Sequence, residues 1–153
     1  MVMKRRLRLR KNNDNVRYTI EYMENNSSYV PGVCNINPKE VAYRKKAAIA
    51  GFAIAAVVLI GLLFTNVNPI IRGVIVFLPL FVGVIGYFQV KNSFCVSYGA
   101  KGQQNATAGS EKASEVTEVD AKQADKRKAR SMNLQAFVIS LIMSIVVMLI
   151  PTF

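Results

Sequence analysis

Three long runs of uncharged apolar residues constrain the fold of this chain more than any other feature. They cover residues 47–64, 73–90 and 134–150 of the 153-residue sequence, and none of them contains Asp, Glu, Lys, Arg or His. An α-helix rises about 1.5 Å per residue, so each run reaches about 26 Å, close to the roughly 30 Å hydrocarbon core of a bilayer. Because lipid offers the backbone no hydrogen-bonding partner, each run should be helical. We therefore predict an all-α integral membrane protein with three transmembrane helices.

The distribution of positive charge predicts how these helices are oriented. Eleven of the 20 Lys and Arg residues precede the first run, eight lie between the second and the third, and only Arg72 lies between the first and the second. Cytoplasmic loops carry the excess of Lys and Arg in membrane proteins. We expect residues 1–36 to be a basic cytoplasmic N-terminal segment. Residues 37–150 would form the membrane domain, with a cytoplasmic loop at 91–133, in a bacterial plasma or inner membrane.

The N-terminal segment combines a basic run with a strand-like pattern. Residues 4–11 read KRRLRLRK, which is typical of a topogenic tail, and each cation near an anionic lipid surface contributes about 1 kcal/mol. No aromatic residue interrupts the run and no nucleic-acid-binding motif follows it, so nucleic acid is not an expected partner. Residues 16–23 alternate between apolar and polar and indicate a β-hairpin with residues 29–30. The residues expected to contact anionic lipid are Lys4, Arg5, Arg6, Arg8, Arg10, Lys11, Arg44, Lys45 and Lys46.

Local signals indicate where the helices begin. Asn37 followed by Pro38, and Asn68 followed by Pro69, are typical of a capping residue before the first helical position. Asp120 is a candidate cap for a third helix that continues from about residue 120 to about 150. Residues 99–110 are rich in Gly, Gln, Asn, Ala, Thr and Ser, and we expect a flexible loop there.

Small residues within the runs indicate close helix packing. Ala47, Gly51 and Ala55 are spaced by four, which allows another helix to approach closely, although Ala-rich helices also produce such spacings by chance. Pro79 should kink the second helix because it removes one backbone hydrogen bond. Gly83 and Gly86 follow it. This helix is either a hinge or, more simply, a packing accommodation.

The composition excludes several kinds of chemistry. The chain has no His, which removes the commonest general base and the commonest transition-metal ligand. No ionisable side chain lies within the three runs, which argues against a proton relay or an ion pump. We therefore expect no catalytic residues, no metal, no cofactor and no small-molecule substrate.

Two cysteines are the remaining candidates for chemistry. Cys34 lies just before the first helix and Cys95 just after the second run, both on the predicted cytoplasmic side. Cations in the neighbouring sequence would favour the thiolate form. A dithiol redox pair or a copper(I) site would suit two thiols, whereas the simpler interpretation is two inert, reduced cysteines.

The segments around these cysteines resemble a known group of proteins. The sequence CNINPKE begins at Cys34, GYFQ begins at Gly86, and FCVSYGAKGQQN begins at Phe94. In this order they resemble a group of short bacterial three-helix membrane proteins with Cys-Asn-Ile-x-Pro and Phe-Cys-x-x-aromatic-Gly-x-x-Gly boundaries. The second cysteine segment also resembles, more weakly, the end of the YgaP-like transmembrane domain, although Val96 stands where that domain usually has proline. Neither resemblance implies an activity.

Three functions fit these observations. The first is a non-enzymatic accessory or scaffold subunit of a membrane complex, with membrane lipids and either a protein partner or a second copy of the chain as its partners. The second is a cytoplasmic-face dithiol redox or copper(I) site at Cys34 and Cys95. The third is a minor channel or transporter component, motivated by the kinked second helix.

Overall fold

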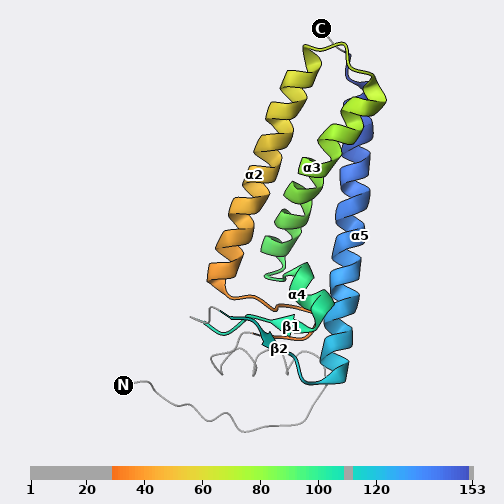
Figure 1. Ribbon diagram of the computed structural model, residues 1–153. Helices are drawn as coiled ribbons and strands as arrows, with labels where there is room; N and C mark the ends of the chain where they lie inside the picture. Colours follow the sequence, from red (N-terminus) through yellow and green to blue (C-terminus); the bar gives the residue numbers. More distant parts are fainter. Residues whose placement is uncertain (1–28, 109–111, 152–153) are drawn as a thin grey trace.

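The computed structural model describes residues 29–108 and 112–151. The elements, in chain order, are α2 (Pro38–Leu63), α3 (Pro69–Lys91), α4 (Val96–Lys101), β1 (Gln103–Gln104), β2 (Ser114–Glu115) and α5 (Val119–Leu149). Figure 1 shows α2, α3 and α5 side by side with α3 between its two neighbours, while α4, β1 and β2 gather at one end of the bundle. The predicted hairpin partner at residues 16–23 and the basic run at 4–11 lie outside the described residues.

The structure confirms the three long apolar helices that the sequence predicts. Each of α2, α3 and α5 is long and apolar enough to cross a membrane. The structure therefore has three candidate membrane-spanning helices, compatible with a multi-pass membrane protein, and one small two-stranded sheet.

Side-chain caps fix the start of the first two long helices, as the sequence predicts. The side chain of Asn37 accepts a hydrogen bond from the backbone N–H of Glu40 at 3.0 Å, and Pro38 is the first helical residue. Asn68 caps α3 in the same way, accepting from the N–H of Ile70 at 2.9 Å. Each cap satisfies a backbone donor that the helix itself leaves unpaired.

Helix α5 also runs as one continuous helix, but it begins differently from the prediction. Its N-cap position is Glu118, which makes no side-chain capping bond. Asp120 lies within the first turn instead, where its negative charge still complements the helix dipole. The prediction of an Asp120 cap was therefore wrong by two residues.

Glycine allows α2 and α3 to approach at backbone distance. A Cβ atom added to Gly51 of α2 would lie 2.6 Å from the backbone N of Gly83 and 3.1 Å from the carbonyl O of Pro79. One turn further along α3, a Cβ on Gly86 would lie 2.9 Å from the Cβ of Ala48. Helix α3 continues through Pro79 without interruption. This seam has room for no larger side chain, as is typical of packed membrane helices.

Helix α5 packs on the other side of α3 through a row of small residues. Ala136, Ser140 and Ser144 follow one another at four-residue spacing, and each is buried. Further along, Val147 joins the buried apolar cluster of Val76 and Leu80 from α3. Helix α3 is therefore the shared support of the other two.

Arg72 closes the end of the bundle that contains the α2–α3 connection and the C-terminus of α5, which we call the distal end. Its side chain is buried, and its Nη2 donates hydrogen bonds to the carbonyl oxygens of Met148, at 3.2 Å, and Ile150. These carbonyls belong to the last turn of α5, which has no helical partner for them. Because Pro69 starts α3, as the sequence predicts, Arg72 lies in the first turn of this helix.

At the other end, α3 stops in a Schellman motif that reverses the chain. The N–H of Phe94 bonds the carbonyl of Gln89, and the N–H of Ser93 bonds that of Val90. Ser93 adopts φ +47°, the left-handed conformation that this motif requires. The reversal places Phe94 and Cys95 beneath α3.

The predicted flexible loop at 99–110 is mostly regular structure in its described part, so that prediction was wrong. Residues 99–101 complete α4, and Gly102 ends this helix at φ +69°. β1 then pairs with β2 in antiparallel register, Gln103 opposite Glu115 and Gln104 opposite Ser114. Contacts with distant segments of the chain give this stretch regular structure despite the weak helix and strand preferences of its residues.

Candidate functional site

Four of the eight buried polar side chains in the described chain meet at the end of the bundle opposite Arg72. Residues 29–37, residues 92–106 and the first turns of α5 come together there, and we call this region the polar junction (Figure 1). Asn35, Asn37, Asn105 and Asp125 are each at most 2 % exposed. Burying a polar group is unfavourable unless it is hydrogen-bonded, so the partners of these four residues define the site.

Asn35 pairs with the peptide groups of Cys95. Its side-chain Oδ1 accepts from the N–H of Cys95 at 2.6 Å, and its Nδ2 donates to the carbonyl O of Cys95 at 3.1 Å. The Asn35 backbone is also bonded on both sides, its N–H to the carbonyl of Ser93 and its carbonyl to the N–H of Asn105. A single residue before α2 thus fixes the turn after α3 and the loop after α4.

Asn37 and Asn105 continue this network towards α2. The N–H of Asn37 donates to the carbonyl of Asn105 at 2.8 Å, and Ile36 and Asn105 form a parallel bridge. The Asn37 side chain, besides capping α2, donates to Asn105 Oδ1 at 3.4 Å and to the carbonyl of Thr107 at 3.2 Å. Asn105 Nδ2 in turn donates to Glu40 at 3.4 Å. The start of α2 is therefore anchored to the loop after α4.

A tight turn before Asn35 docks on α5 through Asp125. The N–H of Val33 bonds the carbonyl of Val30 at 3.0 Å across Pro31 and Gly32, and Gly32 has φ +69°. This is the pattern of a type II turn, which requires a positive φ at the glycine position. The turn presents the N–H of Gly32 to Asp125 Oδ1 at 2.7 Å, while Tyr29 Oη donates to Oδ2 at 3.0 Å.

Asp125 lies in the polar first part of α5, before the apolar run, and burial decides its acidity. Loss of hydration raises the pKa of its carboxyl group, and the hydrogen bonds from Gly32 and Tyr29 offset only part of that effect. Burial, followed by the nearby carboxylate, also raises the pKa of the Tyr29 phenol. Both oxygens of Asp125 are occupied, so the residue is a clamp between the N-terminal turn and α5.

An apolar cluster supports the network from the bundle side. Phe94 is fully buried against Ala129 and Met132 of α5, with Phe88 and Val96 packed around it. A Cβ on Gly99 would lie 2.5 Å from the ring of Phe94 and 3.1 Å from the carbonyl O of Asp125, so this glycine lets α4 lie directly on α5. The polar junction therefore rests on a packed core.

The two predicted thiols both lie in the polar junction, but their surroundings differ from the sequence expectation. Cys34 is half-buried, Cys95 is fully buried, and no disulfide joins them. Burial raises the pKa of the Cys34 thiol, and the negative charge of Asp125 raises it further. The expectation that neighbouring cations favour the Cys34 thiolate was wrong, because desolvation and a carboxylate dominate there.

The structure describes three of the nine cations expected at the lipid surface. Arg44 is half-buried, pairs with Glu40 at 3.3 Å, and lies over the ring of Tyr43 at 5.5 Å. Lys45 and Lys46 are exposed. The other six, in residues 4–11, lie outside the described residues.

The predicted packing residues occupy the helix seam already described, with one shift. Gly51, Gly83, Gly86 and Ala55 are buried, whereas Ala47 is only half-buried. Its neighbour Ala48 makes the contact with Gly86. Because the helical period is 3.6 residues, a contact row alternates steps of three and four, which displaces the row from the strict four-residue spacing.

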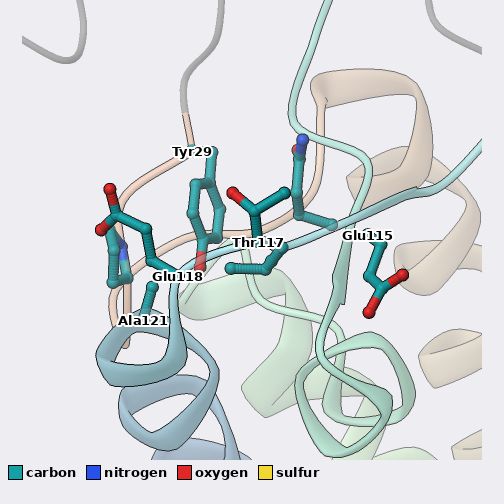
Figure 2. Close-up of a pocket in the computed structure, with 8 residues that line it drawn as sticks. Tyr29, Glu115, Thr117, Glu118 and Ala121 are labelled. Carbon is teal, nitrogen blue, oxygen red and sulfur yellow. The ribbon is translucent and has the colours of Figure 1, made fainter.

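A small pocket opens beside the clamp. It has a volume of about 220 Å³ and lies between the Tyr29 turn, β1, the β2–α5 connection and the start of α5. Figure 2 shows Tyr29, Thr117 and Glu118 around it, with Ala121 of α5 below and Glu115 at the side. Glu115 is held by Lys122 at 2.7 Å, which lowers its pKa. Among the described residues, no three His, Cys, Asp or Glu side chains gather as metal ligands would.

Sequence reasoning identified Asn37 as a helix cap but did not identify Asn35, Asn37, Asn105 or Asp125 as buried groups. Asn35 and Asn105 belong to the two segments that carry the family resemblance, and this was the available signal. Asp125 gave none, because one acid among the five of residues 111–125 looks like a solvated residue. Comparison with protein-family models, curated proteins and solved structures finds no match to this chain.

Proposed function

We propose that this protein is a non-enzymatic accessory or scaffold subunit of a membrane complex. In this proposal the polar junction faces the cytoplasm and the bundle crosses the plasma or inner membrane three times. The charge distribution supports this orientation, since 19 of the 20 Lys and Arg residues fall outside the α2–α3 connection and the start of α3. Anionic lipid and a protein partner, or a second copy of the chain, are the proposed contacts.

The single observation that carries the proposal is how the buried polar groups of the junction are used. In enzymes, such groups keep free donors or acceptors that face a cleft and bind a substrate there. Here Asn35, Asn37, Asn105 and Asp125 bind the backbone or side chains of the chain itself. Their effect is to hold residues 29–37 in a fixed position on α5 at the membrane surface. A rigid platform joined to a membrane anchor is what a scaffold requires.

The location of the small residues adds to this argument. Gly51 packs against Gly83 within the same chain, so this glycine supports the protomer and is not left for a partner. A partner would instead contact a surface that the bundle leaves exposed. The outer surface of the polar junction, which segments far apart in the sequence form together, is such a surface. Substitution of Gly51 would therefore be a poor test of assembly.

The test is native mass spectrometry of the full chain extracted from its own membrane in mild detergent, with a pair of matched variants. Asp125→Ala releases the turn at Gly32, whereas Asp120→Ala removes an exposed acid of the same helix. We expect a complex of defined mass for the natural chain and for Asp120→Ala, and its loss for Asp125→Ala. A bare monomer from the native membrane, or a complex that persists in all three proteins, would contradict the proposal.

A further inference from the structure

The buried guanidinium of Arg72 has donors that the described protein does not satisfy. Arg72 is 1 % exposed, and its Nη2 is used by the carbonyl groups of Met148 and Ile150. Nε and Nη1 have no hydrogen-bond partner among the described residues, and no described carboxylate pairs with the charge. A buried charge without a counterion is strongly unfavourable, so this site needs an anion.

The depth of Arg72 indicates which anion is available. Helix α3 has 23 residues and is about 34 Å long, slightly more than a hydrocarbon core of roughly 30 Å. Arg72 lies three residues from the helix start, about 4.5 Å along the axis. The first turn of α3 therefore lies at the level where hydrocarbon meets lipid headgroups.

The surface around Arg72 is apolar. Ile70 and Ile71 are 65 % and 54 % exposed on the same helical turn, and Pro69 is exposed as well. Large apolar side chains in this position favour a lipid environment over an aqueous one. A lipid phosphate is the anion that a bilayer supplies at this depth, whereas a protein carboxylate would have to be delivered by a partner.

We propose that Arg72 binds the phosphate of a phospholipid headgroup at the distal end of the bundle. Nη1 and Nε donate charge-assisted hydrogen bonds to phosphate oxygens, and the helix dipole at the start of α3 favours the negative charge. Protein atoms cover both nitrogens in the present conformation. Binding therefore turns the guanidinium outward on its flexible stem, as Arg side chains do near bilayer surfaces. The proposal holds for either orientation of the chain in the membrane and does not depend on the scaffold function.

The experiment measures lipid binding to the purified full chain in detergent by native mass spectrometry. The probes are a phosphatidylglycerol and a galactosyl diacylglycerol with the same acyl chains, which differ in the phosphate. The variants are Arg72→Gln and Arg72→Lys, with Lys91→Gln as the control, since Lys91 is an exposed cation at the opposite end of the same helix. Arg72→Lys keeps the charge and a donor for the α5 carbonyls, so it preserves a folded protein if the Gln variant fails to fold.

We expect the natural chain to bind the phospholipid at least about tenfold more tightly than the galactolipid, the equivalent of one charge-assisted hydrogen bond. Lys91→Gln should keep this preference, Arg72→Lys should weaken it, and Arg72→Gln should abolish it. Equal binding of the two lipids, or an unchanged preference in both Arg72 variants, would overturn the proposal. Loss of the preference on addition of inorganic phosphate would also overturn it, because the site would then take any phosphate and not a lipid headgroup.

Discussion

Substituting Asn35 by Ala tests the central hydrogen-bonding unit of the polar junction. The side chain of Asn35 satisfies both the N–H and the carbonyl group of Cys95, at 2.6 Å and 3.1 Å, and both residues are fully buried. Alanine leaves the N–H of Cys95 unpaired in a site that water does not reach, while the carbonyl of Cys95 keeps only its bond from the N–H of Gly99. A buried, unsatisfied group costs about 1–3 kcal/mol, so the junction should lose at least about 1–3 kcal/mol of local stability.

Hydrogen–deuterium exchange of the Cys95 amide is the appropriate assay, because it reports local opening without global unfolding of the helices. A loss of at least about 1 kcal/mol lowers the protection of this amide at least about fivefold. Asn66→Ala is the matched control, since Asn66 is exposed in the α2–α3 connection, and its effect should be below about 0.5 kcal/mol.

The Asn35→Asp variant tests separately the two hydrogen bonds that the Asn35 side chain makes with Cys95. The carboxylate keeps an acceptor for the N–H of Cys95, but its other oxygen faces the Cys95 carbonyl and repels it. We expect the Asp variant to be destabilised as well, despite its nearly identical shape. Unchanged protection of Cys95 in both Asn35 variants would refute the assignment of Asn35 as the residue that holds the turn after α3.

Three further predictions follow from the helix seam and the junction. Gly51→Val should lower the thermal stability by about 1–3 kcal/mol because the new side chain meets Gly83. Gly61→Ala, with nothing within 4 Å of its added Cβ, should instead raise helix stability by about 0.5–1 kcal/mol. Equal melting temperatures of the two variants would contradict the close approach of α2 and α3. Alkylation of the native protein followed by mass spectrometry should leave the buried Cys95 unmodified. Cys34 should react more slowly at pH 7 than a free thiol because its pKa is raised. Rapid labelling of either cysteine would contradict its burial. Because the folded state raises the pKa of Asp125, the favourable contribution of this group is present below its unfolded pKa and is lost as pH rises through the folded value. In chemical denaturation, the natural chain should therefore gain stability relative to Asp125→Asn as the pH falls from 7 towards 4. A relative loss of stability would show that the pKa is lowered instead.

Local sequence signals were sufficient wherever a feature depends on residues close in the chain. Uncharged runs identified the three long helices, because a membrane requires apolar length and internal backbone bonding. Asn37 and Asn68 were recognisable as caps because a cap bonds a backbone N–H two or three residues ahead. Pattern reasoning was weaker for the segment at 99–110, whose composition indicates a loop although contacts with residues far away in the chain give it regular structure.

The sequence by itself therefore determined the three long helices, the caps of α2 and α3, and the asymmetry of positive charge. Only the tertiary structure decided what the buried Asn35, Asp125 and Arg72 do, because their side-chain bonds join positions 60 or more residues apart: Asn35 with Cys95, Asp125 with Gly32, and Arg72 with Met148. No local pattern distinguishes a buried Asp or Arg from a solvated one. The distinction arises when packing removes water, and from then on the stability of each such group depends on the partner that the fold provides.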